Sequence, residues 1–472
     1  MNFPCRIERD FLGDMEIPAA AFWGIHAARA VDNFPISGIR LQSMPDFIQA
    51  FGFVKKAATR ANLALGVIDE VRGGAILAAC DELIAGLWQD QFVVDVIQGG
   101  AGTSTNMNAN EVIANVALQK MGFDKGRYDQ LHPNDHVNAS QSTNDVYPTA
   151  MRVALWRCIE RLLQSMAVLR QGFERKAQEF SEVLSIGRTQ LQDAVPMSLG
   201  QGFLTYAIML AEDEARLREA RTLLQEINLG ATAIGTGINA PPGYADLACA
   251  FLAEESGIPL VKAFNLMEAT QDTGAFVQLS GVLKRVATKL SKTCNDLRLL
   301  SSGPQAGFGD ISLPARQAGS SIMPGKVNPV IPEVVNQVAF EVIGNDVTIT
   351  MASEAGQLQL NAFEPIIAWS LFKSIEHLNQ ACLTLQQRCV SGIQANRDML
   401  KQRVSESITL VTSLGPLIGY EKAALLAKTA MSHSDFSIQE IAMNFGLLTD
   451  AEVALLRQSE LLSKPFIGHS TP

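Results

Sequence analysis

Long helical periodicity dominates the middle of the chain. Between Met151 and Leu184, apolar residues recur at intervals of mostly three and four, with no proline and only Gly172 as an internal glycine. Similar patterns cover residues 196–227, 273–302, 332–355 and 364–391. Such helices exceed the globular average of about 11–12 residues, so they must bury their apolar faces along one another. The pattern predicts a central bundle of about five helices, which also packs between subunits.

The two ends of the chain have shorter and less regular patterns. The N-terminal part predicts helices near 45–65 and 72–88, followed by glycine-rich loops, and strand-like alternation is scarce. The C-terminal part predicts short helices near 421–431, 437–445 and 449–461. We therefore predict a mainly α fold with three domains. These are an N-terminal domain at 1–140, the long-helix bundle at 141–395 with an irregular loop at 317–331, and a small helical domain at 396–472.

Composition narrows the possible partners. The net charge of −10 and the pI near 5.2 disfavour nucleic acid and anionic membranes, because both require a basic face. The seven cysteines are scattered without a CxxC pair, which favours a reduced, cytoplasmic setting over a disulfide framework or zinc cluster. We see neither a secretory signal nor an apolar run long enough to cross a bilayer. A soluble protein without nucleic-acid or membrane partners is expected.

Four polar loops interrupt the helical pattern. Their Ser, Thr and Asn side chains are short hydrogen-bonding groups that can surround a carboxylate without bringing full charges. The loops are GGAGTSTNMNANE (99–111), SQSTNDVYP (140–148), IGRTQLQDAVP (186–196) and GSSIMPGKVNP (319–329). In the first, glycines lead into a helix start, where backbone N–H groups and the helix dipole would face an anion. Singly these residues are ordinary helix caps, but four such loops beside long helices favour one shared anion site.

The segment HPNDH (132–136) contains two histidines four residues apart. Pro133 argues against the helix that would align them on one metal, and no third ligand is evident. We therefore predict no metal site. The remaining histidines are expected to be structural or exposed: residues 26, 377, 433 and 469.

The polar loops together resemble the fumarase/aspartase superfamily, whose members eliminate across a C–N or C–O bond to release fumarate. The similar segments follow the same order over nearly the whole chain: GAGTSTNMNANE, HPNDHVN, QSTND, GRTQLQDAVP, LGATAIGTG, CNDLRLLSSGP and GSSIMPGKVNP. The resemblance implies a homotetramer with each active site built from three subunits, a small dicarboxylate substrate and no cofactor.

Two further segments resemble the aspartase branch of that superfamily: PEVVNQVAFEVIGND (332–346) and EAGQLQLNAFEP (354–365). Fumarases typically carry arginine in place of Glu364 and histidine in place of Gln190. Loss of hydroxide from malate needs a general acid, which glutamine cannot be, whereas an ammonium group already carries its proton. Ammonia elimination from L-aspartate is therefore favoured. A class II fumarate hydratase is the alternative, ahead of a lyase with a larger substrate or a non-catalytic scaffold.

The resemblance also implies a role for individual residues. Ser320 would be the base, acting as an alkoxide that the following backbone N–H groups and Lys326 stabilise. Glu333 would support Lys326 from the start of the next helix. The residues implied in substrate binding are Thr103, Ser142, Thr143 and Ser321 around the side-chain carboxylate, Thr189, Lys326 and Asn328 around the other carboxylate, and Asn144 and Gln190 at the amino group.

Three further features accompany this set. A possible second anion site would consist of His132, Asn134 and Asp135. Gln305 stands where the superfamily usually has arginine, and the tail past residue 461 is short and atypical. These departures affect the expected regulation and subunit contacts rather than the expected catalytic residues.

Overall fold

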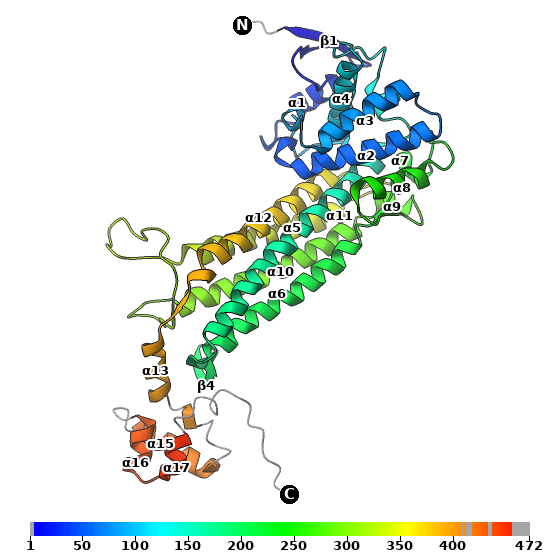
Figure 1. The fold of residues 1–472 in the computed structure, drawn as a ribbon. Coiled ribbons are helices and arrows are strands. Elements are labelled where there is room, and N and C mark those ends of the chain that lie inside the picture. The colour runs from blue at the N-terminus through cyan, green and yellow to red at the C-terminus, as the bar shows by residue number, and fades with distance from the viewer. Residues whose placement is uncertain (1–3, 408, 412–417, 433–436, 456–472) are drawn as a thin grey trace. The chain divides into compact units, whose positions relative to one another are not determined.

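The computed structural model describes residues 4–407, 409–411, 418–432 and 437–455. Its five longest helices lie where the periodicity predicted them (Figure 1). They are α5 (Thr143–Glu179), α6 (Leu199–Thr222), α10 (Gly274–Leu300), α11 (Val330–Glu354) and α12 (Glu364–Arg388). The predicted mainly α architecture with long central helices is confirmed.

Helix α5 begins eight residues before the predicted stretch. Its first two turns contain Pro148, which the sequence pattern treats as a boundary because proline has no N–H for the helix. The carbonyl of Asn144, four residues earlier, instead accepts a hydrogen bond from Asn228 Nδ2 at 3.0 Å. At the other end, Leu184 belongs to strand β3 rather than to the helix.

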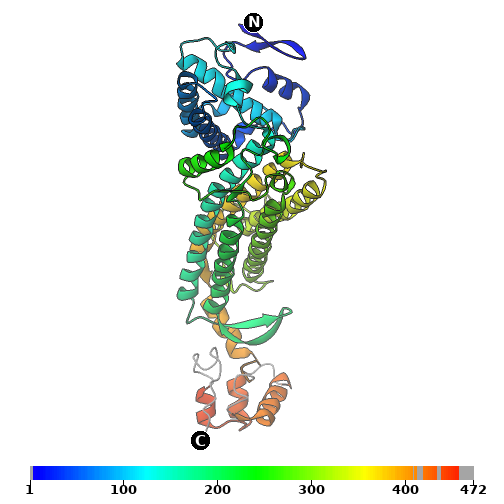
Figure 2. The ribbon, with the colours of Figure 1, turned by 90° about the vertical axis from the view of Figure 1, so that its right-hand side faces the viewer.

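The chain separates into two compact units, and each unit holds part of all five long helices. Figure 2 shows the fold turned by 90° from the view of Figure 1. Unit 1 comprises residues 1–163, 215–287 and 340–379, and unit 2 comprises 164–214, 288–339 and 380–472. The three domains predicted from the sequence follow consecutive segments instead, and their boundaries remain a prediction.

Unit 1 contains the N-terminal helices, which pack on α5 and α12. Phe47 on α2 contacts the rings of Phe51, Tyr147 and Phe372 at centroid distances of 5.1–5.2 Å. The other elements of this unit are β1 (Cys5–Asp10), β2 (Gly13–Pro18), α1 (Ile25–Asn33), η1 (Leu41–Ser43), α2 (Pro45–Ala64), α3 (Glu70–Ile84), η2 (Gln89–Gln91), α4 (Thr103–Lys120), η3 (Pro133–Val137), β5 (Glu226–Ile227), α7 (Thr232–Gly235), α8 (Tyr244–Ser256), β6 (Val261–Lys262) and α9 (Glu268–Gln271). Strands β1 and β2 pair antiparallel, and β5 and β6 pair parallel.

Unit 2 contains a hairpin, the remaining parts of the long helices and a C-terminal group of short helices. Phe173, Phe180 and Phe203 form an aromatic cluster between α5 and α6. The other elements are β3 (Leu184–Thr189), β4 (Gln192–Ser198), β7 (Ile311–Ser312), η4 (Val390–Gly392), β8 (Gln394–Ala395), α13 (Arg397–Glu406), α15 (Tyr420–Ser432), α16 (Ile438–Asn444) and α17 (Asp450–Leu455). Strands β3 and β4, and β7 and β8, pair antiparallel.

The short C-terminal helices were also predicted. Helices α15 and α16 confirm the patterns at 421–431 and 437–445, and α17 confirms the start of the third. Residues 456–461 of that third pattern, the tail past 461, His433 and His469 lie outside the described residues. Within the described ranges, no helix is long and apolar enough to cross a membrane.

Candidate active site

The predicted site residues of unit 1 gather at two neighbouring helix starts. Helix α4 begins at Thr103 and α5 at Thr143. One turn into α4, Asn106 Nδ2 donates to Thr143 Oγ1 at 3.0 Å, which joins the two starts. The positive ends of two helix dipoles therefore accompany these hydroxyl side chains, as an anion site requires.

The glycine-rich loop before α4 needs its glycines. Gly100, Ala101 and Gly102 have φ angles of 90°, 53° and 87°, so three consecutive residues adopt the left-handed region. A Cβ on Gly102 would lie 2.1 Å from Cδ2 of Tyr147, which is far inside contact distance. Thr103 Oγ1 donates to the Gly100 carbonyl at 2.7 Å and closes the turn. The close approach of Tyr147 thus determines both the loop's shape and its composition.

The hydroxyl groups of the turn before α5 retain hydrogens for a ligand. Ser142 Oγ accepts a hydrogen bond from the Asn144 N–H at 3.3 Å, and Thr143 Oγ1 accepts one from Asn106. Each oxygen acts as an acceptor in these bonds, so its own O–H is left to donate. Asn144 Nδ2 donates to the Ala233 carbonyl at 2.7 Å. Hydrogen bonds to residues remote in sequence fix the turn, while its hydroxyl donors remain available to an anion.

A buried lysine stands behind this turn, and the sequence reasoning missed it. Lys55 Nζ donates to Asn138 Oδ1 and Gln141 Oε1, both at 2.9 Å. Burial lowers the pKa of Lys55 to about 7, against the opposing effect of Asp145. The one signal in the sequence is a lysine among the mostly apolar residues of α2, where a charged side chain that becomes buried needs partners.

The HPNDH segment corrects one sequence interpretation. Pro133 was expected to prevent a helix, but it begins the short π-helix η3, because proline is tolerated in a first helical turn. His132 Nδ1 accepts the N–H groups of Asn134 and Asp135 at 3.1 and 3.3 Å, and His136 Nδ1 accepts the His132 N–H at 2.7 Å. Both Nδ1 atoms thus bind backbone instead of facing a common metal. The proposed second anion site remains a prediction.

In unit 2, Thr189 and Gln190 lie at the tip of the β3–β4 hairpin. Gln190 and Leu191 form the turn with φ angles of 53° and 63°. Asn and Gly are the usual residues for such a turn, so this backbone is strained, as residues at functional sites often are. Arg188 anchors the hairpin, because Nη1 donates to Asp310 Oδ2 at 2.6 Å.

Ser320 lies in the irregular loop that was predicted before α11. Its Oγ accepts the N–H groups of Ile322 at 3.2 Å and Met323 at 3.1 Å. Two backbone N–H groups after Ser320 thus point at this oxygen, as the sequence predicted, and the role of Ser320 as the base remains a prediction. Lys326 and Ser320 also line one cavity of about 390 Å³ within this loop.

The same loop is closed by hydrogen bonds between its own residues. The Gly319 N–H donates to the Lys326 carbonyl at 2.8 Å, and Asn328 Nδ2 donates to the Gly319 carbonyl at 3.0 Å. A Cβ on Gly319 would lie 2.8 Å from that Lys326 oxygen. Ser321 and Lys326 are exposed. Glu333 is in the first turn of α11 as predicted, with its Oε1 3.9 Å from Arg298 Nη2, and its support of Lys326 remains a prediction.

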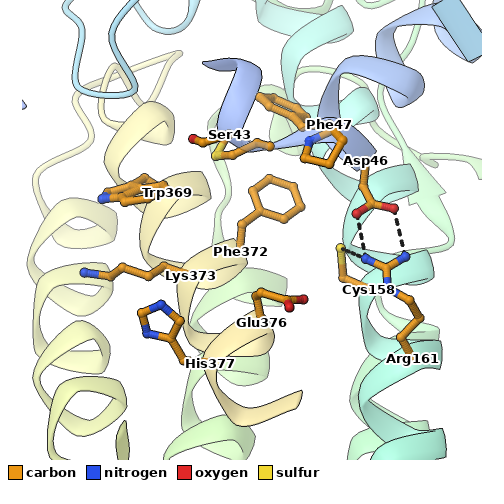
Figure 3. A pocket seen from close by; sticks show the side chains of 12 residues that line it. Ser43, Asp46, Phe47, Cys158, Arg161, Trp369, Phe372, Lys373, Glu376 and His377 are labelled. Carbon is orange, nitrogen blue, oxygen red and sulfur yellow. Dashed lines mark hydrogen bonds and ion pairs between the residues drawn. The ribbon is translucent and has the colours of Figure 1, made fainter. Parts of the chain in front are cut away.

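Another pocket of unit 1 contains none of the predicted residues (Figure 3). It encloses about 440 Å³ between the start of α2 and helices α5 and α12. Phe47, Trp369 and Phe372 give it an apolar lining, and Arg161 forms a two-bond ion pair with Asp46 there. Across the described ranges, no three His, Cys, Asp or Glu side chains gather as a metal site.

Comparison with known proteins decides the family. The sequence model of the Lyase family matches residues 13–344, and that of the fumarase C C-terminus matches residues 410–462. The chain belongs to the fumarase/aspartase superfamily of lyases.

Among the curated relatives of this lyase are two named aspartate ammonia-lyase. That of Helicobacter pylori (strain ATCC 700392 / 26695) is 56% identical over 460 residues, covering 98% of each chain. That of Escherichia coli K12 is 53% identical over 454 residues, covering 96% of this chain and 95% of the relative.

Solved structures share the fold. A cobalt-bound fumarate lyase:delta crystallin of Brucella melitensis is 53% identical, with a TM-score of 0.94 and coverage of 97% of this lyase and 99% of that chain. The class II fumarase of Schistosoma mansoni is 33% identical, with a TM-score of 0.91 and coverage of 98% and 100%.

Within this lyase, the predicted residues fall into two groups, one in each unit. The group in unit 1 consists of Thr103, Ser142, Thr143 and Asn144, with His132, Asn134 and Asp135 in the neighbouring segment. The group in unit 2 consists of Thr189, Gln190, Ser320, Ser321, Lys326, Asn328 and Glu333. Hydrogen bonds join the two helix starts of the first group. The residues of the second group lie on the β3–β4 hairpin, in the loop before α11 and at the start of α11.

Proposed function

We propose that this lyase is an aspartate ammonia-lyase, which reversibly eliminates ammonia from L-aspartate to give fumarate. The observation that carries the proposal is the near-full-length similarity to curated aspartate ammonia-lyases. Gln190 at the hairpin tip adds a chemical reason, because it cannot supply the proton that a leaving hydroxide needs. An ammonium group leaves as neutral ammonia without that proton.

Ser320 serves as the base in this reaction. Its alkoxide takes the proton from the carbon beside the side-chain carboxylate, and the electron pair moves onto that carboxylate to form an enediolate. The pair then returns to form the C=C bond as the C–N bond breaks and ammonia departs. Lowering the serine pKa costs about 1.4 kcal/mol per unit. The N–H groups of Ile322 and Met323 support such a shift.

Neutral donors bind the charge that develops on the substrate. The free O–H groups of Ser142 and Thr143, beside two helix starts, suit the enediolate because their dipoles are already oriented. Thr103 and Ser321 complete this set. Thr189, Lys326 and Asn328 bind the other carboxylate, and Asn144 and Gln190 contact the amino group.

The active site combines residues from three subunits of a homotetramer. The apolar face of α11 supports this arrangement, because Phe340, Val347 and Met351 recur there at helical spacing and each is 57–67% exposed. A long helix with a second apolar face is expected to bury that face against other copies of the chain.

A two-substrate assay tests the proposed function. Purified protein is given L-aspartate or L-malate separately, and fumarate is followed by its ultraviolet absorbance. We expect rapid fumarate formation from aspartate and at least 100-fold slower formation from malate. A Ser320→Ala preparation purified in parallel sets the background from contaminating lyases. Equal rates on the two substrates would make the enzyme a hydratase and refute the proposal.

A further inference from the structure

The carboxyl group of Asp145 connects two segments that are remote in sequence. Asp145 is fully buried directly after the turn that contains Ser142 and Asn144. Its Oδ1 accepts the Ser142 N–H at 3.1 Å, and its Oδ2 accepts the Thr232 N–H at 2.8 Å. One side chain therefore ties the turn before α5 to the loop at 228–235.

That loop adopts a backbone conformation that needs external support. Thr232 and Ala233 have φ angles of 42° and 39°, in the left-handed region that L residues disfavour. The flanking Gly230 and Gly235 are also left-handed, and a Cβ on Gly235 would lie 2.3 Å from the Met267 backbone. Such a strained backbone persists only where neighbouring groups stabilise it. The Asp145 carboxyl group, which accepts the Thr232 N–H, is one of these groups.

The strained loop in turn orients Asn144. The Ala233 carbonyl accepts Asn144 Nδ2, while the Asn144 carbonyl accepts Asn228 Nδ2. That carbonyl is available because Pro148 supplies no helical N–H. The side-chain amide nitrogen and the backbone carbonyl of Asn144 are thus both bonded to the loop at 228–235. The peptide unit between Thr232 and Ala233 lies directly between the Asp145 contact and the Asn144 contact.

We propose that Asp145 is a positioning residue, which holds the loop at 228–235 in its left-handed conformation so that Asn144 faces the substrate amino group. This role rests on the proposed aspartate ammonia-lyase function. Asp145 touches no substrate. It acts through Ser142 on one oxygen and through Thr232 and Ala233 on the other.

The chemistry of the pocket explains why a carboxyl group is needed. Both oxygens meet N–H donors, so an asparagine would turn its NH₂ group toward one of them. Burial raises the pKa of Asp145 to about 7, and the N–H groups of Thr232 and Ser142 and the charge of Lys55 act in the opposite direction. The buried hydroxyl of Tyr244 is close enough for Asp145 to raise its pKa further. An uncharged substitute would leave a buried donor unpaired.

Asp145→Asn is the first test. We expect kcat for aspartate to fall about 100-fold, with a smaller change in KM, because the donors to the transition state lose their alignment. Adding Ala233→Gly to Asp145→Asn should raise kcat at least tenfold above that of the single variant. Glycine adopts a φ near 39° without support, and Ala233 is exposed. No recovery would reduce Asp145 to a structural residue and overturn the proposal.

Asp95→Asn is the matched control. Asp95 is another buried aspartate that accepts backbone N–H groups, from Ser37, Gly38 and Ile97. Its loss should lower the unfolding temperature but leave kcat/KM within twofold of the natural enzyme. An equal loss of kcat in both variants would point to general destabilisation and overturn the proposal.

A second variant covers a failure of Asp145→Asn to fold. Asn228→Ala removes the bond to the Asn144 carbonyl and should lower kcat about tenfold in a folded protein. Unchanged kcat would overturn the inference. The proposed function fails separately: it is lost if the natural enzyme does not deaminate aspartate, whereas the inference is lost if that enzyme is active and the variants match it.

Discussion

The turn at 142–144 and the loop at 319–328 contribute to the same proposed chemistry but are held in different ways. The turn is bonded to side chains and backbone remote in sequence, through Asn106, Ala233 and Asn228. The hydrogen bonds described for the loop run within the loop itself. Ile322 at its tip is 84% exposed.

This difference separates two tasks of an elimination catalyst. Donors that stabilise an enediolate work best when their dipoles are fixed beforehand, which the buried contacts of the turn provide. A base that must admit substrate and then exclude water benefits from a segment that can close. We infer that the loop keeps its internal shape, with the two N–H groups on Ser320, while it moves as a body.

We expect the largest effect from Ser320→Ala, which removes the proposed base from the loop. We expect turnover of aspartate to fall by about 10⁴-fold, the upper end for loss of a catalytic base, because no other group replaces the alkoxide. Fumarate absorbance measures the rate, and gel filtration should show an unchanged assembly. Ser142→Ala, which removes one donor of the turn, should cost less, about 10²-fold. A Ser320→Ala enzyme with a tenth of normal activity would exclude this serine as the base.

Gly102→Ala tests the rigidity of the turn's surroundings. The new Cβ would overlap the Tyr147 ring at a left-handed position, so we expect a loss of about 2–5 kcal/mol in the free energy of unfolding. Denaturant unfolding measures it. The control is Gly74→Ala on α3, where nothing beyond the adjacent backbone of the helix lies within 4 Å of the added Cβ and alanine should stabilise by about 0.5–1 kcal/mol. Equal effects would show that the loop before α4 tolerates movement.

Glu364→Gln gives the most specific effect, because it depends on pH. Burial raises the pKa of Glu364 to about 8, partly offset by Arg152, from an ordinary value of 4.5. The folded state therefore holds a proton that the unfolded state releases, and natural stability should fall as pH rises from about 4.5 to 8. The variant should lose this slope, with unfolding midpoints that match near pH 4.5 and diverge toward pH 8. Parallel curves over that range would contradict the buried, protonated state.

Much of this architecture could be predicted from local sequence. The long helices follow from sustained three-and-four spacing, and the turns follow from glycine and hydroxyl residues before helix starts. The N–H groups on Ser320 were also predicted, because they come from the two following residues in a glycine- and proline-shaped loop. Each of these features depends on neighbours within a few positions of the chain.

The support of the site depends on contacts between segments that are remote in sequence. Lys55 meets Asn138 across 83 residues, and Asp145 meets Thr232 across 87, so no local pattern indicates either contact. Pro148 shows the same limit, because its cost to a helix is local while its compensation by Asn228 is not. Burial and left-handed strain arise when remote segments pack, and they turn ordinary Asp and Lys residues into the scaffold of the site.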